Sequence, residues 1–370
     1  MKKLFILSIA SGYGGAERSI EIILRHLPPD LMVRIYAENN LHLEKLMQPD
    51  ALPPNGKLIR IKDSSSLWGR RKASLRLVAD CLLHPDAAIL INTNTSARIA
   101  AMSAKFMPSL GKRCYIYIRD FLWQDLDYIF SRLPELMIFL PSASVTKRLG
   151  YINPFYLQPT GPAPFSVIPD MTTVPPGQVT YDGPFLHLAT INPWKGHVDL
   201  MMALKILKDE NREVKATSFG MVGNALLHTH LNQLIKSLGI SGCYSLLSYI
   251  PTPDLHLRDC RAVIVPSVSH SGGPETFGRA VIEAWSYRKP VVAYATGSLA
   301  ELVEHEVNGL LVQEGDINAL AQAIGRLSES PELCRSLGMA GYEKVRSHFE
   351  AGAVTKLLLD RMKDMRIDEA

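Results

Sequence analysis

Two glutamates, Glu275 and Glu283, lie eight residues apart in the stretch SHSGGPETFGRAVIEAW, residues 269–285. The run AVIVPS before them is typical of a strand, and FGRAVIEAWSYR is typical of a helix. The start of a helix exposes unpaired N–H groups and a partial positive charge, which favour a bound phosphate. At a rise of ~1.5 Å per residue, the two carboxylates would lie about 12 Å apart along the axis. That spacing fits a nucleotide-diphosphate sugar, with sugar hydroxyls at one carboxylate and ribose hydroxyls at the other. Two solvated glutamates on a capped amphipathic helix would show the same spacing.

The composition limits the class of protein. The chain has 370 residues, a formal net charge of +4 and 47% hydrophobic residues, which favours two domains of roughly 150 to 200 residues each. A mildly basic chain suits anionic ligands or an anionic membrane, but its charge is too low to indicate nucleic-acid binding. Five cysteines without a C-x-x-C pair indicate buried thiols in a reducing compartment. We therefore expect a cytoplasmic protein, able to reach the inner face of the cytoplasmic membrane.

Short apolar runs alternate with helical patterns, which is typical of a parallel sheet covered by helices on both faces. The strands predicted in the N-terminal half are 3–10, 32–38, 87–93, 113–120 and 135–142. The helices predicted there are 16–27, 70–83, 96–107 and 143–149. In the C-terminal half the predicted strands are 185–191, 215–221, 244–250, 262–267, 290–295 and 309–315. The predicted helices are 197–209, 225–238, 277–288, 299–304, 316–328 and a broken one over 331–370. The first strand resembles a signal peptide, but the glycine-rich loop and amphipathic helix that follow favour a strand.

The proline-rich stretch 153–184 interrupts this alternation and predicts an interdomain linker. We expect an α/β protein with one Rossmann-like domain over 1–165 and a second over 166–349. A last helix over about 350–370 is expected to pack back on the first domain. Two such domains would face each other across a cleft, and ligands would bind in the loops after the strands.

The segment PETFGRAVIEA resembles the E-x7-E motif of retaining GT-B glycosyltransferases, in particular glycosyltransferase family four. VPS before it, KPVVAYATGSLAELV after it and VNGLLVQEGDINALAQAI extend the resemblance over about 185–345. The N-terminal half resembles the family more loosely, chiefly at GGAERS. The resemblance implies a GT-B fold whose N-terminal domain binds the acceptor and whose C-terminal domain binds the nucleotide-sugar donor.

The resemblance assigns roles to residues that match the family's motifs. Glu275 would contact hydroxyls of the donor sugar, and Glu283 would bind the ribose. Lys195, in LATINPWKGH, would neutralise the leaving phosphate, where electrostatic catalysis is most effective. The backbone amides that would hold the diphosphate belong to Thr276, Phe277, Gly278 and Arg279. Gly14 and Gly15 match the family's Gly-Gly, whose amides face the phosphates and the sugar. Tyr249 and Ile250 would lie near the base.

Two positions depart from the family's pattern. Thr190 stands where the family usually places an arginine, so one phosphate contact is in doubt, and Arg279 is a candidate to replace it. Arg119 stands where many members carry a histidine. An arginine stays protonated and cannot act as a base, but it could bind an acceptor phosphate or orient the sugar. The alternative is a structural pair between Arg119 and Asp120.

The remaining candidates concern the acceptor, metals and membranes. The residues expected to bind the acceptor are Glu17, Arg18, Arg119 and Asp120; a capping carboxylate and a solvated arginine are the alternative for the first two. Asn94 could reach the cleft or cap a helix. The histidines and carboxylates show no metal-site spacing, so we expect no metal and no obligate cofactor. The stretch 66–83, SLWGRRKASLRLVADCLL, could lie on an anionic membrane or pack on the sheet as a surface helix.

We expect a retaining glycosyltransferase that moves a sugar from a UDP- or GDP-sugar to a hydroxyl of a glycan or lipid-linked acceptor. Bacterial surface polysaccharide or lipopolysaccharide synthesis is the expected pathway, and retention and pathway rest on the resemblance. The catalytic candidates are Glu275, Lys195 and Arg119. No clear nucleophile is visible, which favours a front-face route. A nucleotide-sugar epimerase of the same fold and a non-catalytic sugar-nucleotide-binding module are the alternatives. A nicotinamide-dependent dehydrogenase is disfavoured because the glycine loop lacks G-x-G-x-x-G.

Overall fold

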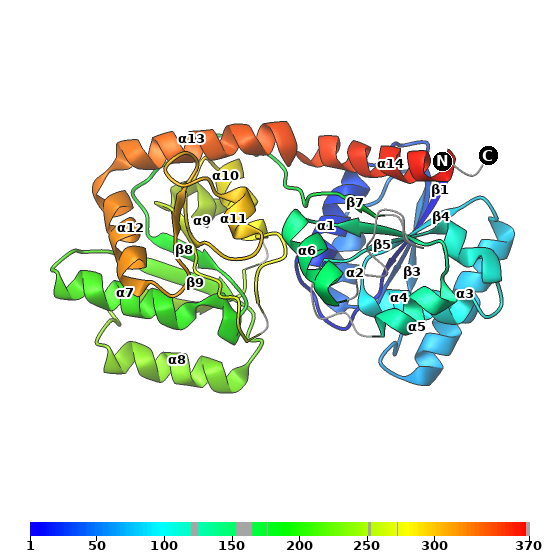
Figure 1. The fold of residues 1–370 in the computed structure, drawn as a ribbon, viewed down its shortest axis with the longest axis horizontal. Helices are drawn as coiled ribbons and strands as arrows, with labels where there is room; N and C mark the ends of the chain where they lie inside the picture. Colours follow the sequence, from blue (N-terminus) through cyan, green and yellow to red (C-terminus); the bar gives the residue numbers. More distant parts are fainter. Residues whose placement is uncertain (120–124, 153–164, 176, 251–252, 272, 368–370) are drawn as a thin grey trace. The chain divides into compact units, whose positions relative to one another are not determined.

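The computed structural model describes residues 1–119, 125–152, 165–175, 177–250, 253–271 and 273–367. The chain forms two compact units (Figure 1): one is Met1–Met171 with Ala351–Ala370, and the other is Thr172–Glu350. Each unit is built on a parallel sheet with helices on both faces. The expectation of two Rossmann-like α/β domains is confirmed.

The first unit has a seven-stranded sheet in the order β3-β2-β1-β4-β5-β6-β7. Its strands are β1 (Lys3–Ser8), β2 (Met32–Ala37), β3 (Gly56–Arg60), β4 (Ala88–Ile91), β5 (Cys114–Tyr117), β6 (Met137–Leu140) and β7 (Phe165–Val167). Its helices are α1 (Gly15–Arg25), α2 (Asn40–Leu46), α3 (Leu67–Leu83), α4 (Asn94–Ser103), η1 (Pro108–Arg113), α5 (Leu126–Arg132), α6 (Ala143–Ile152) and α14 (Ala351–Ile367). Helices α3, α4 and α5 contribute to the core on one face of the sheet, and α1, α2 and α14 to the core on the other.

The second unit has a six-stranded sheet in the order β10-β9-β8-β11-β12-β13. Its strands are β8 (Phe185–Leu188), β9 (Ala216–Gly220), β10 (Tyr244–Ser248), β11 (Val263–Val265), β12 (Val291–Tyr294) and β13 (Leu310–Val312). Its helices are η2 (Pro193–Lys195), α7 (His197–Asp209), α8 (Ala225–Ser237), α9 (Asp254–Asp259), α10 (Arg279–Ser286), α11 (Leu299–Leu302), α12 (Ile317–Glu329) and α13 (Pro331–His348). The long C-terminal helix is broken between α13 and α14, as expected.

The proline-rich stretch is not a simple linker. Within it, β7 pairs in parallel with β6, with Phe139 opposite Ser166, so the interpretation of 153–184 as wholly linker is wrong. Proline is tolerated beside a short edge strand, because its missing N–H then removes no hydrogen bond between central strands. Residues 153–164 lie outside the described part. The chain passes from one unit to the other at Met171 and returns after Glu350.

Short elements escape the sequence patterns. Helix α2 has seven residues and is capped by Asn39, whose side-chain oxygen accepts from the amides of Leu41 and His42 at 3.0 and 3.2 Å. With fewer than two full turns, its apolar period has too few repeats to be recognised. Strand β3 and helices α5 and α9 were not predicted for the same reason: each is too short to show its period. Among the described helices, none is long and apolar enough to cross a membrane.

Within the second unit, helix α13 packs closely at Gly338 against the backbone that follows α10. A Cβ on this residue would lie 1.8 Å from the carbonyl oxygen of Arg288. Glycine to alanine stabilises a free helix by roughly 1 kcal/mol, but this overlap should cost about 1–3 kcal/mol or more. We expect Gly338→Ala to lower the urea midpoint of the second unit. Met339→Ala, at an exposed neighbouring position, should leave it nearly unchanged, and a stabilised Gly338→Ala would contradict this packing.

Candidate functional site

Lys195 and Glu275 meet at the carboxyl edge of the second sheet. Lys195 follows β8, and Glu275 follows the neighbouring strand β11. The Lys195 ammonium pairs with Oε1 of Glu275, and the Ser267 hydroxyl donates to the same oxygen at 2.8 Å. The two charged side chains are 17% and 12% exposed. The Lys195 nitrogen also lies 3.7 Å from the centre of the Trp194 ring, which holds the cation in place.

The backbone brings the two loops together. The Val268 amide donates to the Trp194 carbonyl at 2.9 Å. Gly196 has φ +69°, and a Cβ there would lie 1.9 Å from the Pro266 carbonyl oxygen. Only glycine fits this close approach in a left-handed conformation. On the other side, the Ser298 amide and hydroxyl both donate to the Glu275 carbonyl at 3.1 Å. Ser267 and Ser298 are site residues that the sequence reasoning missed, although both lie inside the quoted motif blocks.

The helix after Glu275 starts later than expected. Helix α10 begins at Arg279, with Gly278 as its N-cap, so Glu275 lies four residues before the first helical residue. The separation of about 12 Å along one helix axis is therefore wrong, because only part of the segment is helical. Thr276 is half-buried and Phe277 is buried, packing edge-on against Phe349 with ring centres 5.6 Å apart.

Glu283 lies inside α10 and is buried. It is 7% exposed, and its Oε1 accepts from Nη2 of Arg279, one turn earlier, at 2.9 Å. Glu275 is also largely covered, so the alternative of two solvated glutamates is wrong. A buried carboxylate requires a charged or polar partner, and Arg279 supplies it here.

A buried histidine pair lies under the Lys195 loop. The rings of His187 and His197 have centres 4.5 Å apart. Nε2 of His197 donates to the Thr190 carbonyl at 3.3 Å, and Nδ1 of His187 lies 3.0 Å from the Ser218 hydroxyl. Burial lowers the pKa of His197 to about 4 and holds the pKa of His187 well below its usual range. Both rings are therefore neutral at pH 7. No sequence pattern indicates the pair, because only the fold brings the two residues together.

Tyr249 and Ile250 follow β10 directly, at the carboxyl edge of the same sheet, and both are half-buried. β10 is separated from β8 by β9. Their role near a base stays a prediction. In the described part of the chain, no group of three His, Cys, Asp or Glu side chains could hold a metal ion.

In the first unit, the glycine loop after β1 is fixed by α1. The Gly14 amide donates to Oε2 of Glu17 at 2.8 Å, so Glu17 caps its own helix. This side chain is 5% exposed. Burial raises its pKa, while the Gly14 amide and the charges of His42 and Arg119 lower it. Gly14 and Gly15 are exposed and Arg18 is half-buried.

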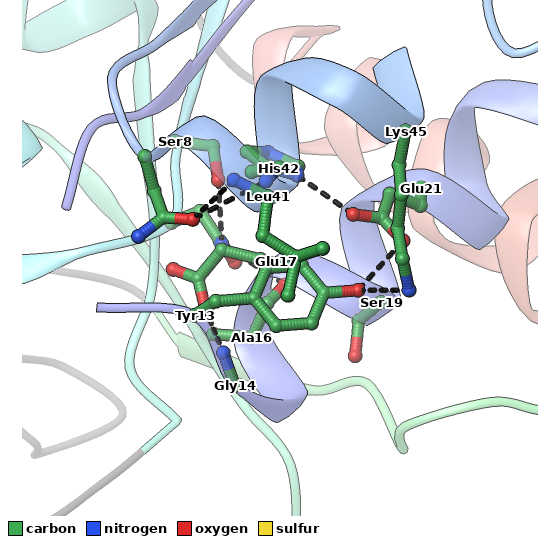
Figure 2. A network of polar contacts seen from close by, with 12 residues as sticks. Ser8, Tyr13, Gly14, Ala16, Glu17, Ser19, Glu21, Leu41, His42 and Lys45 are labelled. Carbon is green, nitrogen blue, oxygen red and sulfur yellow. Dashed lines mark hydrogen bonds and ion pairs between the residues drawn. The ribbon is translucent and has the colours of Figure 1, made fainter. Parts of the chain in front are cut away.

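A network of polar side chains holds this loop in position (Figure 2). The Tyr13 hydroxyl donates to Oε2 of Glu21 at 3.0 Å and accepts from Nζ of Lys45 at 2.7 Å. Nδ1 of His42 lies 2.8 Å from Oε1 of Glu21. The network joins the loop to α1 and α2, and sequence reasoning missed it because α2 itself was not expected.

Arg119 is held inside the first unit. Its guanidinium pairs with Oδ1 of Asp170 at 3.1 Å and lies over the Tyr117 ring, 3.7 Å from the centre. The same Asp170 oxygen accepts from the Ser19 hydroxyl on α1 at 2.7 Å. Asp120, the partner suggested from the sequence, lies outside the described residues. Arg119 and Glu17 therefore lie at the same edge of the sheet.

Asn94 is not a helix cap. The N-cap of α4 is Thr93, whose hydroxyl accepts from the Ser96 amide at 3.2 Å, and Asn94 is the first helical residue. Threonine and asparagine are both good N-caps, and Thr93, which is in extended conformation, takes the cap position.

Comparison with known proteins places the Lys195–Glu275 site in a recognised segment. The family model of glycosyl transferases group 1 matches residues 181–344. The chain is 30% identical over 166 residues to the lipopolysaccharide core biosynthesis glycosyltransferase LpsD of Rhizobium meliloti (strain 1021), over 45% of each chain. It is 28% identical over 167 residues to the amylovoran biosynthesis glycosyltransferase AmsK of Erwinia amylovora, over 44% of this chain and 40% of that one. The matched region thus spans less than half the length of these curated relatives.

Solved structures resemble nearly the whole chain. Anabaena HepE in complex with UDP and glucose has a TM-score of 0.79 at 20% identity, over 98% of this chain and 99% of that chain. The apo form of the lipopolysaccharide outer core galactosyltransferase WaaB has a TM-score of 0.67 at 14% identity, over 100% and 99%. At these identities the likeness shows the fold, which is the two-domain GT-B fold expected from the sequence.

The buried histidines make stability depend on pH. A histidine whose folded pKa is about 4 against an ordinary 6.5 binds its proton more readily when unfolded. Stability is then present above pH 6.5 and is lost as the pH falls towards 4, by up to roughly 3 kcal/mol for His197. We expect urea unfolding of the second unit to show this loss, and His197→Asn to reduce the slope. His230→Asn, at an exposed position on α8, serves as the control; an unchanged slope in His197→Asn would contradict the assignment.

Proposed function

We propose that this chain is a retaining glycosyltransferase that moves a sugar from a UDP- or GDP-sugar to a hydroxyl of a glycan or lipid-linked acceptor. The observation that carries the proposal is the covered Lys195–Glu275 pair at the carboxyl edge of the second sheet, with buried Glu283 on the helix that follows. All three residues lie within the segment matched by the glycosyl transferases group 1 model. The printed functions of LpsD and AmsK support surface-polysaccharide or lipopolysaccharide synthesis as the pathway.

Donor binding would replace the ion pair between Lys195 and Glu275 by contacts of both residues with the donor. A diphosphate beside Lys195 would compete with Glu275 for the ammonium, and the released Glu275 carboxylate would accept from sugar hydroxyls. The amides from Thr276 to Arg279 would hold the diphosphate at the start of α10. Glu283, buried within α10 and paired with Arg279, would accept from the ribose hydroxyls. With Thr190 at the family's arginine position, Arg279 supplies the second cation.

The chemical step would follow a front-face route. The bond from the anomeric carbon to the leaving phosphate breaks, and the bond to the acceptor oxygen forms on the same face of the sugar. The acceptor proton passes to an oxygen of the leaving phosphate. Lys195 stabilises the negative charge that grows on that phosphate, and the Trp194 ring beneath its ammonium already holds it in place before the reaction. These bond changes and the proton transfer need no metal or further cofactor.

The acceptor would be bound by the first unit. Glu17 is engaged with the glycine loop and Arg119 with Asp170, so we assign Glu17 the role of shaping the Gly14–Gly15 loop. Arg119 and Arg18 present positive charge to an acceptor phosphate or sugar, and Arg119 acts as an orienting group rather than a base. An acceptor carried on lipid would require contact between the first unit and a membrane.

Removing the Lys195 charge tests the catalytic role. We expect Lys195→Ala to lower kcat by about 10²–10³-fold, as for other groups that stabilise transition-state charge. Glu275→Gln should lower kcat/KM by a similar factor. The measurement is transfer of labelled sugar from the donor to a lipid-linked acceptor fraction. Lys236→Ala, on α8 away from the site, should be unaffected; full activity of Lys195→Ala would contradict the mechanism.

Nucleotide binding tests the donor site separately from turnover. At a hundred times its dissociation constant, a ligand adds roughly 2.7 kcal/mol of stability, so UDP or GDP should raise the melting temperature of the wild type. Glu283→Gln should lose most of this shift, and Glu343→Gln, at an exposed position on α13, should keep it. Binding without transfer to any acceptor would favour a non-catalytic module. Release of free nucleotide without transfer would favour an epimerase.

A further inference from the structure

One face of α3 exposes large apolar side chains. The apolar residues on it are Leu67, Trp68, Leu75, Leu82 and Leu83, which are 53%, 64%, 56%, 68% and 71% exposed. Large exposed apolar side chains gathered on one helix face can mark an interaction site. We call this side, together with its basic residues, the outer face of α3.

The outer face is not needed to build the domain. The opposite side of α3 contributes Ala73, Leu77 and Cys81 to the core of the first unit. The Ser74 hydroxyl lies 3.0 Å from the Ser103 hydroxyl at the end of α4. The helix is therefore anchored by this side, and the exposed leucines and tryptophan lie outside the core of the unit.

The charge on the outer face has one sign. Arg71, Lys72 and Arg76 are exposed among the apolar residues. The only acidic residue of α3, Asp80, is 3% exposed and is engaged by Arg34, Arg76 and Tyr36. Nζ of Lys72 lies 5.5 Å from the centre of the Trp68 ring. The face therefore offers cations beside an aromatic ring, with no exposed carboxylate along the helix.

A neighbouring segment continues the same character. Phe106, three residues after α4 ends, is 64% exposed, and Lys105 before it is exposed. The buried contact between Ser103 and Ser74 joins the end of α4 to the core side of α3. The nearest exposed carboxylates in sequence, Asp63 and Asp86, lie beyond the two ends of the helix, and Asp86 is paired with Lys3.

We propose that the outer face of α3 docks the first unit on an anionic lipid surface. A helix of 17 residues is about 25 Å long and would lie in the plane of the interface. The leucines and Trp68 would enter the headgroup region, as apolar and aromatic side chains do in interfacial helices. Arg71 and Lys72 can extend their charged ends to lipid phosphates, as long basic side chains do. The absence of exposed carboxylates along this helix favours a polyanionic surface over an ordinary protein partner. The inference stands without the transferase chemistry of the second unit.

Vesicle binding tests the docking surface. We expect the full chain to sediment with phosphatidylcholine vesicles that also contain phosphatidylglycerol, and much less with phosphatidylcholine alone. Arg71→Gln with Lys72→Gln should weaken binding about fivefold per charge removed. Leu75→Gln with Leu82→Gln should weaken it at least as much. Each variant should keep the wild-type melting temperature and the UDP-dependent or GDP-dependent shift, which separates this test from that of the donor site.

Matched changes elsewhere provide the control. Arg335→Gln with Arg346→Gln removes two exposed cations from α13, and Met339→Gln removes an exposed apolar side chain from the same helix. We expect these variants to bind vesicles as the wild type does. Equal loss in the control variants, or no binding of the wild type to anionic vesicles, would overturn the proposal. It would also be overturned if the wild type were a dimer in solution that Leu75→Gln with Leu82→Gln converts to a monomer.

Discussion

The parallel pairing of strands buried on both faces is the constraint on which the rest of this structure depends. Every strand in such a sheet runs in the same direction, so the loops after the strands collect at one edge. The faces are occupied by apolar side chains of the covering helices. In each unit the candidate site residues lie at the carboxyl edge of that unit's own sheet: Lys195 and Glu275 in the second unit, Gly14 and Arg119 in the first.

At the carboxyl edge of each sheet the charged groups are largely covered, and they pair within their own unit. Lys195 is matched by Glu275, Glu283 by Arg279, and Arg119 by Asp170. A covered charge without a partner would cost several kcal/mol. These pairs therefore neutralise the covered charges before any ligand is present. They also set a condition on ligands, because an incoming anion must offer Lys195 at least as good a partner as Glu275. A diphosphate, with more than one negative charge, meets that condition.

Much of the fold could be predicted from the sequence because long apolar runs and long helices repeat their period several times. The Lys195–Glu275 site could be predicted for a different reason, since both residues belong to recognisable sequence blocks. The contacts of Arg119 could not be predicted, because its partner Asp170 is distant in sequence. Asp170 also binds Ser19, which lies 151 residues away. The start of α10 was misjudged because the apolar pattern extends back to Phe277, whereas Gly278 adopts φ +82° and caps the helix. Such contacts depend on tertiary packing, which local patterns do not contain.

The return of the chain after Glu350 has a consequence for how the protein is made. Helix α14 supplies Leu358 and Met362 to a core of the first unit, and the Tyr115 hydroxyl donates to the Met362 carbonyl. This helix is translated only after the entire second unit has been made. The second unit can therefore complete its core during synthesis, while the first keeps an apolar face uncovered. The domain that is translated first is the one that finishes folding last.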